Sequence, residues 1–472
     1  MVVRPTPGVD ARDRRIERGL AALLGRDQVL PGTAAEFLRD ATEERGVAGW
    51  ADAVALPRAA DEAAAALAWC YERGVPIVPR GGGTGLAGGA VPQGGVVLST
   101  DRLQAVRSFV PELWRIEVEA GVRTADLRRR ARENGLLFPP DPGAAEQSHV
   151  GGNIATNAGG PHAFKYGTTG AWVTGLEAVV PPGDLVRVGG VLRKDVAGLD
   201  LKRLLIGSEG TLALVTAATL RLIPAPESAL PVVAFFPDLE RGCEAVGSVL
   251  ASGLVPAALD YLDEGALRLA GPSYPGRVPD GAGFALLAEA DGGEAEAAGV
   301  RDGLVDVFAE SALAVETTVD RRALWRWRDG VSLAVATARG GKVSEDLEVP
   351  VERLADAVRA TVEVGRRHGL TGLSWGHAGD GNLHATFLVA PDDGPGHEAA
   401  DGARAELFAV TRALGGSISG EHGLGLLKRE YAEWPAPVAA LQGQIKAAFD
   451  PRGLLNPGKK LPAGGPGSGS RL

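Results

Sequence analysis

A glycine-rich run that directly follows a short apolar segment is the strongest constraint on how this chain can fold. Residues 79–89 read PRGGGTGLAGG, and the apolar residues 75–79 before them predict a strand. The run contains the GxGxxG spacing of dinucleotide-binding folds, but that motif requires a helix that begins at the loop. A helix is improbable here because Pro92 and further glycines follow closely. We therefore interpret the run as a loop whose backbone N–H groups converge on an anion; an ordinary surface loop is the alternative.

A second run of small residues, VGGNIATNAGG, lies at residues 150–160 and is preceded by PPDPG at residues 139–143. Small residues let the backbone approach a large flat ligand. The side chains of Asn153, Thr156 and Asn157 would supply hydrogen-bond donors and acceptors. The two runs together favour a binding surface over two unrelated loops.

Composition excludes several classes of protein. The 472 residues include 45% hydrophobic and 23% charged residues, as in globular proteins, so neither disorder nor a fibrous repeat is expected. The net charge of −10 has the wrong sign for binding a nucleic acid backbone. Only Cys70 and Cys243 occur, which are too few for an iron–sulfur cluster and fit a reducing, cytoplasmic setting. We expect no secretory signal in residues 1–30 and no transmembrane segment, since residues 81–100 carry few large apolar side chains.

The pattern of apolar residues predicts helices that alternate with short strands after a helical lead-in at residues 1–50. Strands are expected at residues 75–79, 95–99, 114–119, 173–180, 185–188 and 211–223, and helices at residues 60–73 and 124–134. The segment Pro224-Ala225-Pro226 is incompatible with a helix and with a central strand, and it therefore predicts a domain boundary. Beyond it, the pattern predicts strands at residues 231–236 and 284–289 and helices near residues 239–252, 293–309, 351–368 and 438–448. These elements predict a sheet with helices on one face.

The two runs, together with LIGSEGTL at residues 205–212, resemble the FAD-binding domain of the vanillyl-alcohol-oxidase type. The resemblance is closest to FAD-linked D-2-hydroxyacid dehydrogenases, which include the glycolate oxidase flavin subunit, D-lactate dehydrogenase and D-2-hydroxyglutarate dehydrogenase. It implies an α+β, two-domain flavoprotein with an FAD-binding domain and a cap domain whose antiparallel sheet is covered by helices. The implied organisation is a helical lead-in at residues 1–50, an FAD-binding domain at 51–225, a substrate and metal cap domain at 226–440, a segment at 441–462 that returns to the FAD domain, and a disordered tail at 463–472.

The resemblance also implies which residues bind FAD. The first run would cradle the pyrophosphate, and the second run with residues 207–211 would line the flavin. No histidine or cysteine lies in the first run, and neither His149 nor His162 matches the family's attachment pattern, so we expect non-covalent FAD. The predicted cofactor-binding residues are Pro79, Arg80, Gly81, Gly82, Gly83, Thr84, Gly85, Leu86, Gly88, Pro142, Gly151, Gly152, Asn153, Thr156, Asn157, Gly159, Gly160, Tyr166, Gly167, Glu209, Gly210, Leu212 and Asn456.

Two of the seven histidines lie in GHAGDGNLH at residues 376–384. Asp-Gly is the preferred pair for a two-residue type I′ hairpin turn, and Asp380-Gly381 lies midway between His377 and His384. A turn there would make the two histidines directly opposed cross-strand neighbours that can share one metal ion. The alternative is a hairpin whose histidines cover the edge of the core.

A carboxylate next to a third histidine lies in SISGEHGLG at residues 417–425. In extended backbone Glu421 and His422 point in opposite directions, so one can bind a metal while the other faces a substrate. The family resemblance implies that His377, His384 and Glu421 ligate one divalent metal ion and that His422 is the general base. Two histidines and one carboxylate leave coordination positions open and suit Zn, Mn or Fe.

Two basic residues match the family positions that hold the substrate carboxylate. They are Arg328 in LWRWR and Lys342 in GKVSED. A planar guanidinium suits a carboxylate, although an arginine beside tryptophans also fits a cation–π or surface role. Relatives that act on dicarboxylates often carry asparagine two residues after the second metal-binding histidine, where this chain has Thr386. The difference favours a small monocarboxylate.

The resemblance implies FAD-dependent oxidation of a small D-2-hydroxy acid, of the glycolate or D-lactate class, to the 2-oxo acid. His422 would take the hydroxyl proton, the metal would bind the substrate, and hydride would pass to flavin N5. With too few cysteines for its own cluster, the chain would pass electrons to an acceptor protein or quinone, which also allows a peripheral place at a membrane; a homodimer is left open. The alternatives are a non-redox FAD-adduct synthase of the alkyl-glycerone-phosphate synthase type and a catalytically silent FAD-binding electron-transfer subunit.

Overall fold

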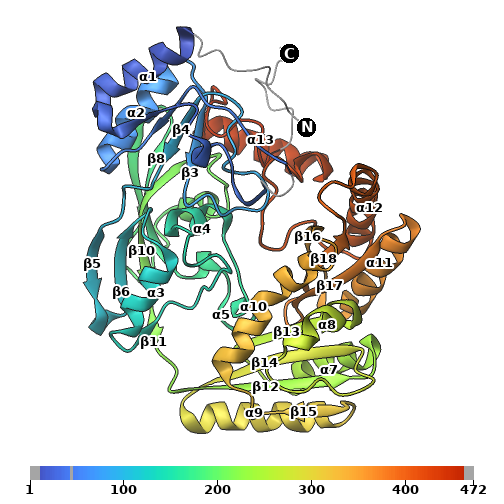
Figure 1. The fold of residues 1–472 in the computed structure, drawn as a ribbon. Helices are drawn as coiled ribbons and strands as arrows, with labels where there is room; N and C mark the ends of the chain where they lie inside the picture. Colours follow the sequence, from blue (N-terminus) through green and yellow to red (C-terminus); the bar gives the residue numbers. More distant parts are fainter. Residues whose placement is uncertain (1–10, 43–45, 462–472) are drawn as a thin grey trace. The chain divides into compact units, whose positions relative to one another are not determined.

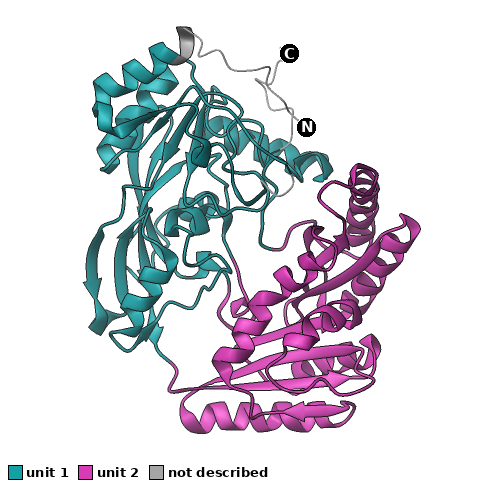
Figure 2. Ribbon diagram, viewed as in Figure 1, with its two compact units in different colours: residues 1–158, 168–225, 421–472 teal, residues 159–167, 226–420 magenta. Residues whose placement is uncertain are grey.

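The computed structural model describes residues 11–42 and 46–461, and the chain divides into two compact units (Figure 2). Unit 1 comprises the chain up to residue 158, residues 168–225 and the chain from residue 421 onward; unit 2 comprises residues 159–167 and 226–420. The passage from unit 1 to unit 2 after Ala225 falls within the predicted Pro-Ala-Pro segment. The predicted tail, residues 463–472, lies outside the described residues, as does part of the predicted lead-in.

The first sheet of unit 1 is a small, mainly parallel sheet in the order β1-β2-β4-β3 (Figure 1). Its strands are β1 (Val29–Pro31), β2 (Ala53–Ala55), β3 (Ile77–Arg80) and β4 (Val96–Ser99), and its helices are α1 (Ala11–Leu24) and α2 (Ala60–Glu72). Strands β2 and β3 both run parallel to β4, and α2 connects them as in a βαβ unit. Leu20 of α1 and Leu67 of α2 are fully buried in the core of this layer. The strand that leads into the first glycine-rich run, β3, is thereby held along its length by β4.

The second sheet of unit 1 is antiparallel, in the order β5-β6-β10-β8-β9. Its strands are β5 (Val106–Val110), β6 (Arg115–Glu119), β8 (Val173–Val180), β9 (Asp184–Gly189) and β10 (Leu214–Arg221). Strands β7 (Leu136–Leu137) and β11 (Ile223–Pro224) pair as a separate two-stranded sheet, and further helices of unit 1 are α3 (Thr124–Arg132), α4 (Val150–Thr156), α6 (Leu201–Leu205) and α13 (Ala436–Phe449). Helix α4 lies inside the second glycine-rich run. The sequence does not predict it because glycine lowers helix propensity.

Unit 2 is built on one seven-stranded antiparallel sheet, in the order β15-β12-β14-β13-β17-β18-β16 (Figure 1). Its strands are β12 (Ser228–Phe236), β13 (Ala258–Asp263), β14 (Phe284–Gly292), β15 (Ala314–Glu316), β16 (Lys342–Glu348), β17 (Thr371–His377) and β18 (Asn382–Leu388). Its helices are α5 (Ala163–Tyr166), α7 (Leu239–Ala251), α8 (Glu264–Ala270), α9 (Glu294–Ala309), α10 (Arg321–Thr337), α11 (Leu354–Arg367) and α12 (Gly394–Ala413).

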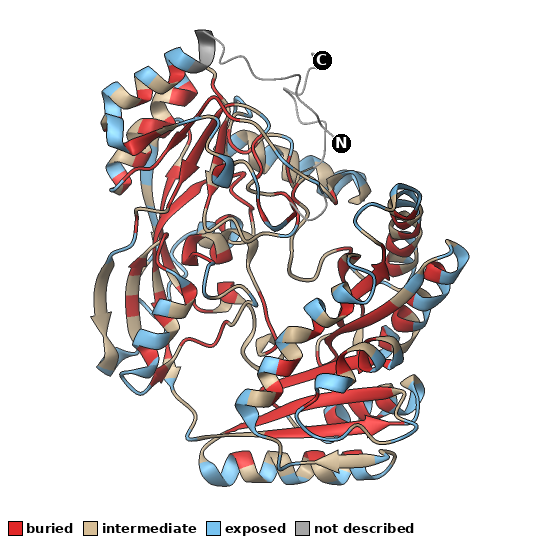
Figure 3. Cartoon of the chain, in the orientation of Figure 1, coloured by how far each residue is buried: buried red, intermediate tan, exposed pale blue. Residues whose placement is uncertain are grey.

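Helices pack on both faces of this sheet, so the prediction of helices on one face was wrong. Side chains of α8 and α10 join Leu287 of β14 in one hydrophobic cluster, whereas Phe308 of α9 contacts Phe236 on the other face. The central strands are buried on both sides, as Figure 3 shows in red. A strand buried on both faces lacks the alternation of apolar and polar residues from which a single covered face can be recognised.

The chain leaves unit 2 earlier than predicted. It returns to unit 1 at Glu421, where the sequence predicted residue 441, and residues 159–167 form part of unit 2 although they lie within the predicted FAD-binding domain. The strand pair between Glu348 and Ser417 still belongs to the unit 2 sheet. Glu421 and His422 therefore follow Ser417, the last residue paired with this sheet, by only four and five residues.

Candidate functional site

The first glycine-rich run is a loop after β3 in which no helix begins, as predicted. No backbone carbonyl in the described part of the chain accepts a hydrogen bond from the N–H groups of residues 81–89. A Cβ atom on Gly82 would lie 2.2 Å from the carbonyl oxygen of Gln147, so a second backbone segment passes directly beside the loop. Successive N–H groups without a backbone partner, in a loop whose backbone passes close to a second segment at Gly82, suit a pyrophosphate. The loop thus fits the phosphates of FAD.

Two predicted FAD ligands, Glu209 and Asn456, hydrogen-bond to neighbouring loops of unit 1. The carboxylate of Glu209 accepts hydrogen bonds from the backbone N–H groups of Leu424 at 3.0 Å and Gly425 at 2.8 Å. The Asn456 amide nitrogen donates to the carbonyl oxygens of Glu209 at 2.7 Å and Gly89 at 3.2 Å. Both side chains therefore hold the loops in place, whatever else they contact.

Three more predicted ligands also have protein partners. Arg80 donates to the backbone carbonyl oxygens of residues 36 and 39, at 2.7 and 2.6 Å. Asn153 donates from its amide nitrogen to the Thr124 hydroxyl at 2.6 Å. Asn157 ends α4 with a left-handed φ of 56°, and its side-chain oxygen accepts from the Gly170 N–H at 2.8 Å. These contacts fix the two glycine-rich runs against the rest of unit 1.

The remaining predicted cofactor residues fall into both units. Tyr166 lies in unit 2, where its hydroxyl donates to the Asp291 carboxylate at 2.6 Å. Three further predicted cofactor residues also belong to unit 2: Gly159, Gly160 and Gly167. Unit 1 holds the others, which lie in the two glycine-rich runs, just before them, or in the segment 205–212: Pro79, Gly81, Gly82, Gly83, Thr84, Gly85, Leu86, Gly88, Pro142, Gly151, Gly152, Thr156, Gly210 and Leu212.

The β17–β18 hairpin exists, but its register differs from the prediction. His377 pairs with Asn382, and His384 pairs with Trp375, so the two histidines are diagonal rather than directly opposed. Only Gly381 has a left-handed φ, of 82°, whereas a type I′ turn needs two such residues. The connection is therefore a four-residue loop over residues 378–381. The two imidazoles still lie on one face of the sheet, with ring centroids 5.7 Å apart.

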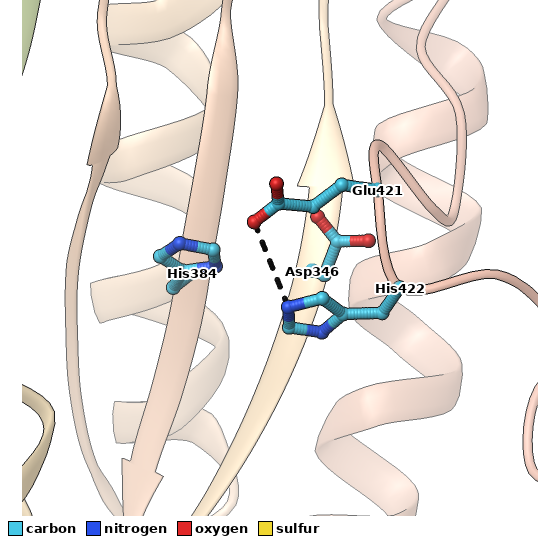
Figure 4. Close-up of side chains that lie close together, drawn as sticks. All are labelled: Asp346, His384, Glu421 and His422. Carbon is cyan, nitrogen blue, oxygen red and sulfur yellow. Dashed lines mark ion pairs between the residues drawn. The ribbon is translucent and has the colours of Figure 1, made fainter. Parts of the chain in front are cut away.

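Four side chains come together at this end of the sheet (Figure 4). Asp346, His384, Glu421 and His422 each offer an atom within 4.8 Å of those of the other three, an arrangement that could hold a metal ion. Asp346 on β16 is the direct cross-strand neighbour of His384 on β18. Its two carboxylate oxygens accept from the Asn382 amide at 2.7 Å and the Ser419 hydroxyl at 3.0 Å. The group supplies two carboxylates and two imidazoles, a donor set suited to Zn, Mn or Fe.

His377, a predicted metal ligand, is not one of these four residues. Its Nδ1 lies 2.7 Å from a carboxylate oxygen of Asp260 on β13, and 3.3 Å from an Nη atom of Arg328. Burial alone would raise the pKa of Asp260, but the charges of Arg328 and His377 outweigh burial and lower it to about 2. The carboxylate is therefore ionised.

The two predicted anchors for a substrate carboxylate are both in contact with protein groups. Arg328 on α10 donates from Nε to Asp260. Lys342 donates to the Ser332 hydroxyl, and its ammonium lies 4.8 Å from the centre of the Trp375 ring. Lys342 and Asp346 share a face of β16 but are four residues apart, or about 13 Å along an extended strand. Lys342 thus makes a cation–π contact with Trp375, an interaction that the sequence suggested only for Arg328.

Sequence reasoning missed Asp346 and Asp260. Asp346 lies in GKVSED, a segment that matches the family. Its distance along the sequence does not indicate that it lies beside His384, because the two residues become neighbours only through the pairing of β16 with β18. Asp260 lies in the apolar strand ALDYLD together with Asp263, which caps α8. The sequence signal that could have identified Asp260 is an acidic residue within an apolar strand. An acidic side chain is seldom buried without a partner, so such a residue predicts a nearby cation or hydrogen-bond donor.

Comparison with protein families matches both parts of the chain. Residues 51–189 match the family described as FAD binding domain, and residues 225–460 match FAD linked oxidases, C-terminal domain. The two matched regions include the first glycine-rich run and the group in Figure 4, respectively.

Several characterised proteins are similar over most of their length. Glycolate oxidase subunit GlcD of Bacillus subtilis is 38% identical over 415 residues, which cover 86% of this chain and 88% of that protein. D-lactate dehydrogenase of Archaeoglobus fulgidus is 37% identical over 420 residues, covering 86% and 90%. The mitochondrial D-2-hydroxyglutarate dehydrogenase of Bos taurus is 33% identical over 473 residues, covering 94% and 84%.

Solved structures share the fold at low sequence identity. 4-Ethylphenol oxidase from Gulosibacter chungangensis has a TM-score of 0.77 at 19% identity, covering 96% of this chain and 98% of that one. p-Cresol methylhydroxylase has a TM-score of 0.76 at 18% identity, with the same coverage. An alkyldihydroxyacetonephosphate synthase has a TM-score of 0.74 at 17% identity, covering 97% and 87%.

The fold and the match to the FAD binding domain define a flavoprotein of the vanillyl-alcohol-oxidase type, with FAD as its cofactor. Within that class, the chain belongs to the FAD-linked oxidases and is an oxidoreductase. The expectations for family, fold class and enzyme class are confirmed. Among the described residues, no helix combines the length and apolar composition that a bilayer-spanning segment requires.

Proposed function

We propose that this enzyme oxidises a small D-2-hydroxy acid, of the glycolate or D-lactate class, to the 2-oxo acid. The observation that carries the proposal is the group of Asp346, His384, Glu421 and His422 at one end of the unit 2 sheet. Two of the most similar relatives bear the names glycolate oxidase subunit and D-lactate dehydrogenase, which point to the same class of substrate.

His384 and Glu421 would hold one divalent metal ion, with His377 or Asp346 as a further ligand. The imidazole and carboxylate donors suit Zn, Mn or Fe. When bound, such an ion supplies a positive charge that polarises an oxygen of the substrate. Glu421 lies 3.7 Å from the Nε2 atom of its neighbour His422, so a metal ligand and a base would lie side by side.

His422 would accept the hydroxyl proton of the substrate as general base. Arg328 would hold the substrate carboxylate with the N–H groups that it does not use for Asp260, and Lys342 would add a positive charge on the same sheet face. Non-covalent FAD, when bound, supplies the hydride acceptor. The unit 1 loop at residues 81–89 would hold its pyrophosphate through backbone N–H groups.

The structure supports a small substrate through Thr386. Its hydroxyl is 2.8 Å from the Ser344 hydroxyl on the neighbouring strand, and neither group carries a charge. Thr386 itself would therefore offer no positive charge to a second carboxylate on the substrate. Thr386 thus favours a monocarboxylate over a dicarboxylate.

Electrons would leave the reduced enzyme for a separate acceptor, either a protein or a quinone. The chain has only two cysteines, Cys70 and Cys243, and an iron–sulfur cluster usually takes four. The acceptor would therefore bring its own redox centre.

Anaerobic addition of single hydroxy acids to the FAD-loaded protein tests the proposal. Glycolate, D-lactate, L-lactate, D-malate and D-2-hydroxyglutarate are added in turn while the visible absorbance of the flavin is followed. We expect glycolate or D-lactate to bleach the flavin fastest and L-lactate to leave it oxidised. Failure of every hydroxy acid to reduce metal-loaded enzyme would contradict the proposal and favour the non-redox synthase class.

A further inference from the structure

The glycine-rich loop at residues 81–89 is held by protein groups through its carbonyl oxygens. The Gly85 carbonyl accepts a hydrogen bond from the Ala41 N–H at 3.0 Å, and the Ala87 carbonyl accepts one from the Leu426 N–H at 2.9 Å. In a planar trans peptide the C=O group and the N–H group that follows it point in opposite directions. The N–H groups after these two carbonyls therefore point away from the side on which the loop is held, which we call the carbonyl side.

Lys459 is buried on the carbonyl side, near the end of the loop. Its Nζ atom donates to the side-chain oxygen of Asn456 at 2.8 Å, and the Asn456 amide nitrogen donates to the Gly89 carbonyl oxygen at 3.2 Å. Only 3% of Lys459 is exposed. A side chain that protein atoms cover to this extent acts on a ligand of the loop through its charge and not by contact.

Two buried carboxyl groups act on Lys459 through their charges. Burial lowers the pKa of Lys459 to about 7, and the charges of Asp40 and Glu209 oppose that shift. Glu209 also accepts a hydrogen bond from the Lys460 ammonium at 3.0 Å, so its charge has a close partner. Asp40 accepts hydrogen bonds from the N–H and hydroxyl groups of Thr42, which are both uncharged.

Asp40 places a negative charge next to the loop. A Cβ atom on Gly85 would lie 3.8 Å from the Asp40 Oδ2 atom, and only 6% of Asp40 is exposed. Burial raises the pKa of Asp40, whereas hydrogen bonds from Thr42 and the charge of Arg80 oppose that shift. An anion this close would repel bound phosphates, and buried charges are screened weakly. A further positive charge on the carbonyl side would therefore strengthen the binding of phosphates.

We propose that Lys459 is a positioning residue for FAD, whose positive charge on the carbonyl side offsets Asp40 so that the N–H groups of the loop can bind the diphosphate. This inference rests on the proposed function, which assigns the loop to the phosphates of FAD. The negative charges of the diphosphate favour the charged form of Lys459 in return. Lys459 thus acts on the cofactor from behind the loop.

The first experiment measures how tightly the full-length protein binds FAD when the charge of Lys459 is removed. Flavin is stripped from the purified protein and titrated back at pH 7 and low ionic strength while its fluorescence is followed. We expect Lys459→Met to bind FAD about tenfold or more weakly than the wild type, because Asp40 then acts on the phosphates unopposed. Lys459→Gln, which keeps a hydrogen-bond donor but no charge, should bind equally weakly. Lys194→Met removes the same charge from an exposed position and should bind as the wild type does.

The second experiment removes the opposing charge. Asparagine keeps a side-chain oxygen for the hydrogen bonds from Thr42, so Asp40→Asn removes the charge and preserves the local contacts. We expect Asp40→Asn alone to bind FAD at least as tightly as the wild type. We expect the double variant, Lys459→Met with Asp40→Asn, to regain most of the affinity that Lys459→Met loses. Loss of packing around Lys459 would not be repaired in this way.

Several results would overturn the proposal while the oxidation of hydroxy acids by FAD-loaded enzyme stands. They are wild-type affinity in Lys459→Met or in Lys459→Gln, and no recovery in the double variant. Weaker binding by Asp40→Asn alone would also overturn it, and this result does not require any Lys459 variant to fold. Unchanged FAD affinity in Gly82→Ala would instead count against the assignment of the loop to the phosphates.

Discussion

The glycine-rich loop of unit 1, which we propose binds the FAD phosphates, and the polar end of the unit 2 sheet are built in opposite ways. The loop at residues 81–89 offers backbone N–H groups and has almost no side chains that could contact a ligand. The sheet end offers the side chains of Asp346, His384, Glu421 and His422, which come from two strands and the segment after them. A site built from backbone N–H groups, which we call the backbone site, depends on the absence of Cβ atoms. A site built from side chains on neighbouring strands, which we call the side-chain site, depends on the register of those strands.

This difference determines which changes each region tolerates. In the loop, any side chain competes with the ligand or with the neighbouring backbone for space. At the sheet end, isosteric changes can leave the fold intact and remove only the chemistry. The following predictions test the contrast, beginning with the largest effect.

Gly82→Ala should abolish activity because the protein loses FAD. The new Cβ would lie 2.2 Å from the Gln147 carbonyl oxygen, so the loop must move and its N–H groups no longer converge. The flavin content of the purified variant, measured by absorbance, checks this.

Gly198→Ala is the control for a glycine substitution in unit 1. A Cβ at residue 198 meets no atom within 4 Å, and the residue does not have a left-handed φ. FAD content should equal that of the wild type. Full flavin in Gly82→Ala would contradict the assignment of this loop to the phosphates.

His422→Ala should slow flavin reduction by the substrate by about 10²–10⁴-fold while FAD remains bound, because general-base catalysis contributes rate enhancements of that size. Stopped-flow absorbance of the anaerobic enzyme gives the rate. His368→Ala serves as the matched control, since His368 pairs with Glu406 on helix α12, outside the group in Figure 4. A wild-type rate in His422→Ala would remove His422 from the role of base.

Glu289→Gln should reduce the acid sensitivity of the fold without removing the group in Figure 4. Burial alone would raise the pKa of Glu289, but hydrogen bonds and charges from His162 and Arg321 outweigh it and hold the pKa at about 2 instead of 4.5. The ionised carboxylate therefore stabilises the folded state above pH 4.5, by about 3 kcal/mol, and this contribution is lost as the pH falls toward 2.

Urea unfolding of wild type and Glu289→Gln between pH 2 and 7 measures that contribution. The wild type should lose more unfolding free energy on acidification than the variant, which has no carboxylate to protonate at this position. Identical pH dependence of the two proteins would show that the polar contacts around Glu289 do not stabilise unit 2.

The sequence predicts the backbone site better than the side-chain site, for physical reasons. The glycines and Pro92 act on the conformation of their own segment, so a loop without a helix can be predicted from them directly. The histidines and Glu421 are recognisable by type, but the register of β17 and β18 depends on which residue of Asp380-Gly381 adopts a left-handed φ, and only Gly381 does.

Two further features depend on contacts that sequence spacing does not reveal. Asp346 becomes a neighbour of His384 only when β16 pairs with β18, across 37 residues of intervening chain that include helix α11. Helix α4 forms in a glycine-rich segment that has low intrinsic propensity, and Ile154 in it is fully buried. Tertiary packing decides such elements, and local preference does not.

The most direct test of the account is flavin reduction by D-lactate or glycolate in enzyme stripped of divalent metal by a chelator and then reloaded. FAD content is measured in each sample so that loss of flavin is not mistaken for loss of metal. We expect reduction to stop in the stripped, FAD-loaded enzyme and to return when Zn²⁺ or Mn²⁺ is restored. Undiminished reduction in protein shown to contain no metal would contradict the claim that the group around His384 and Glu421 works through a bound cation.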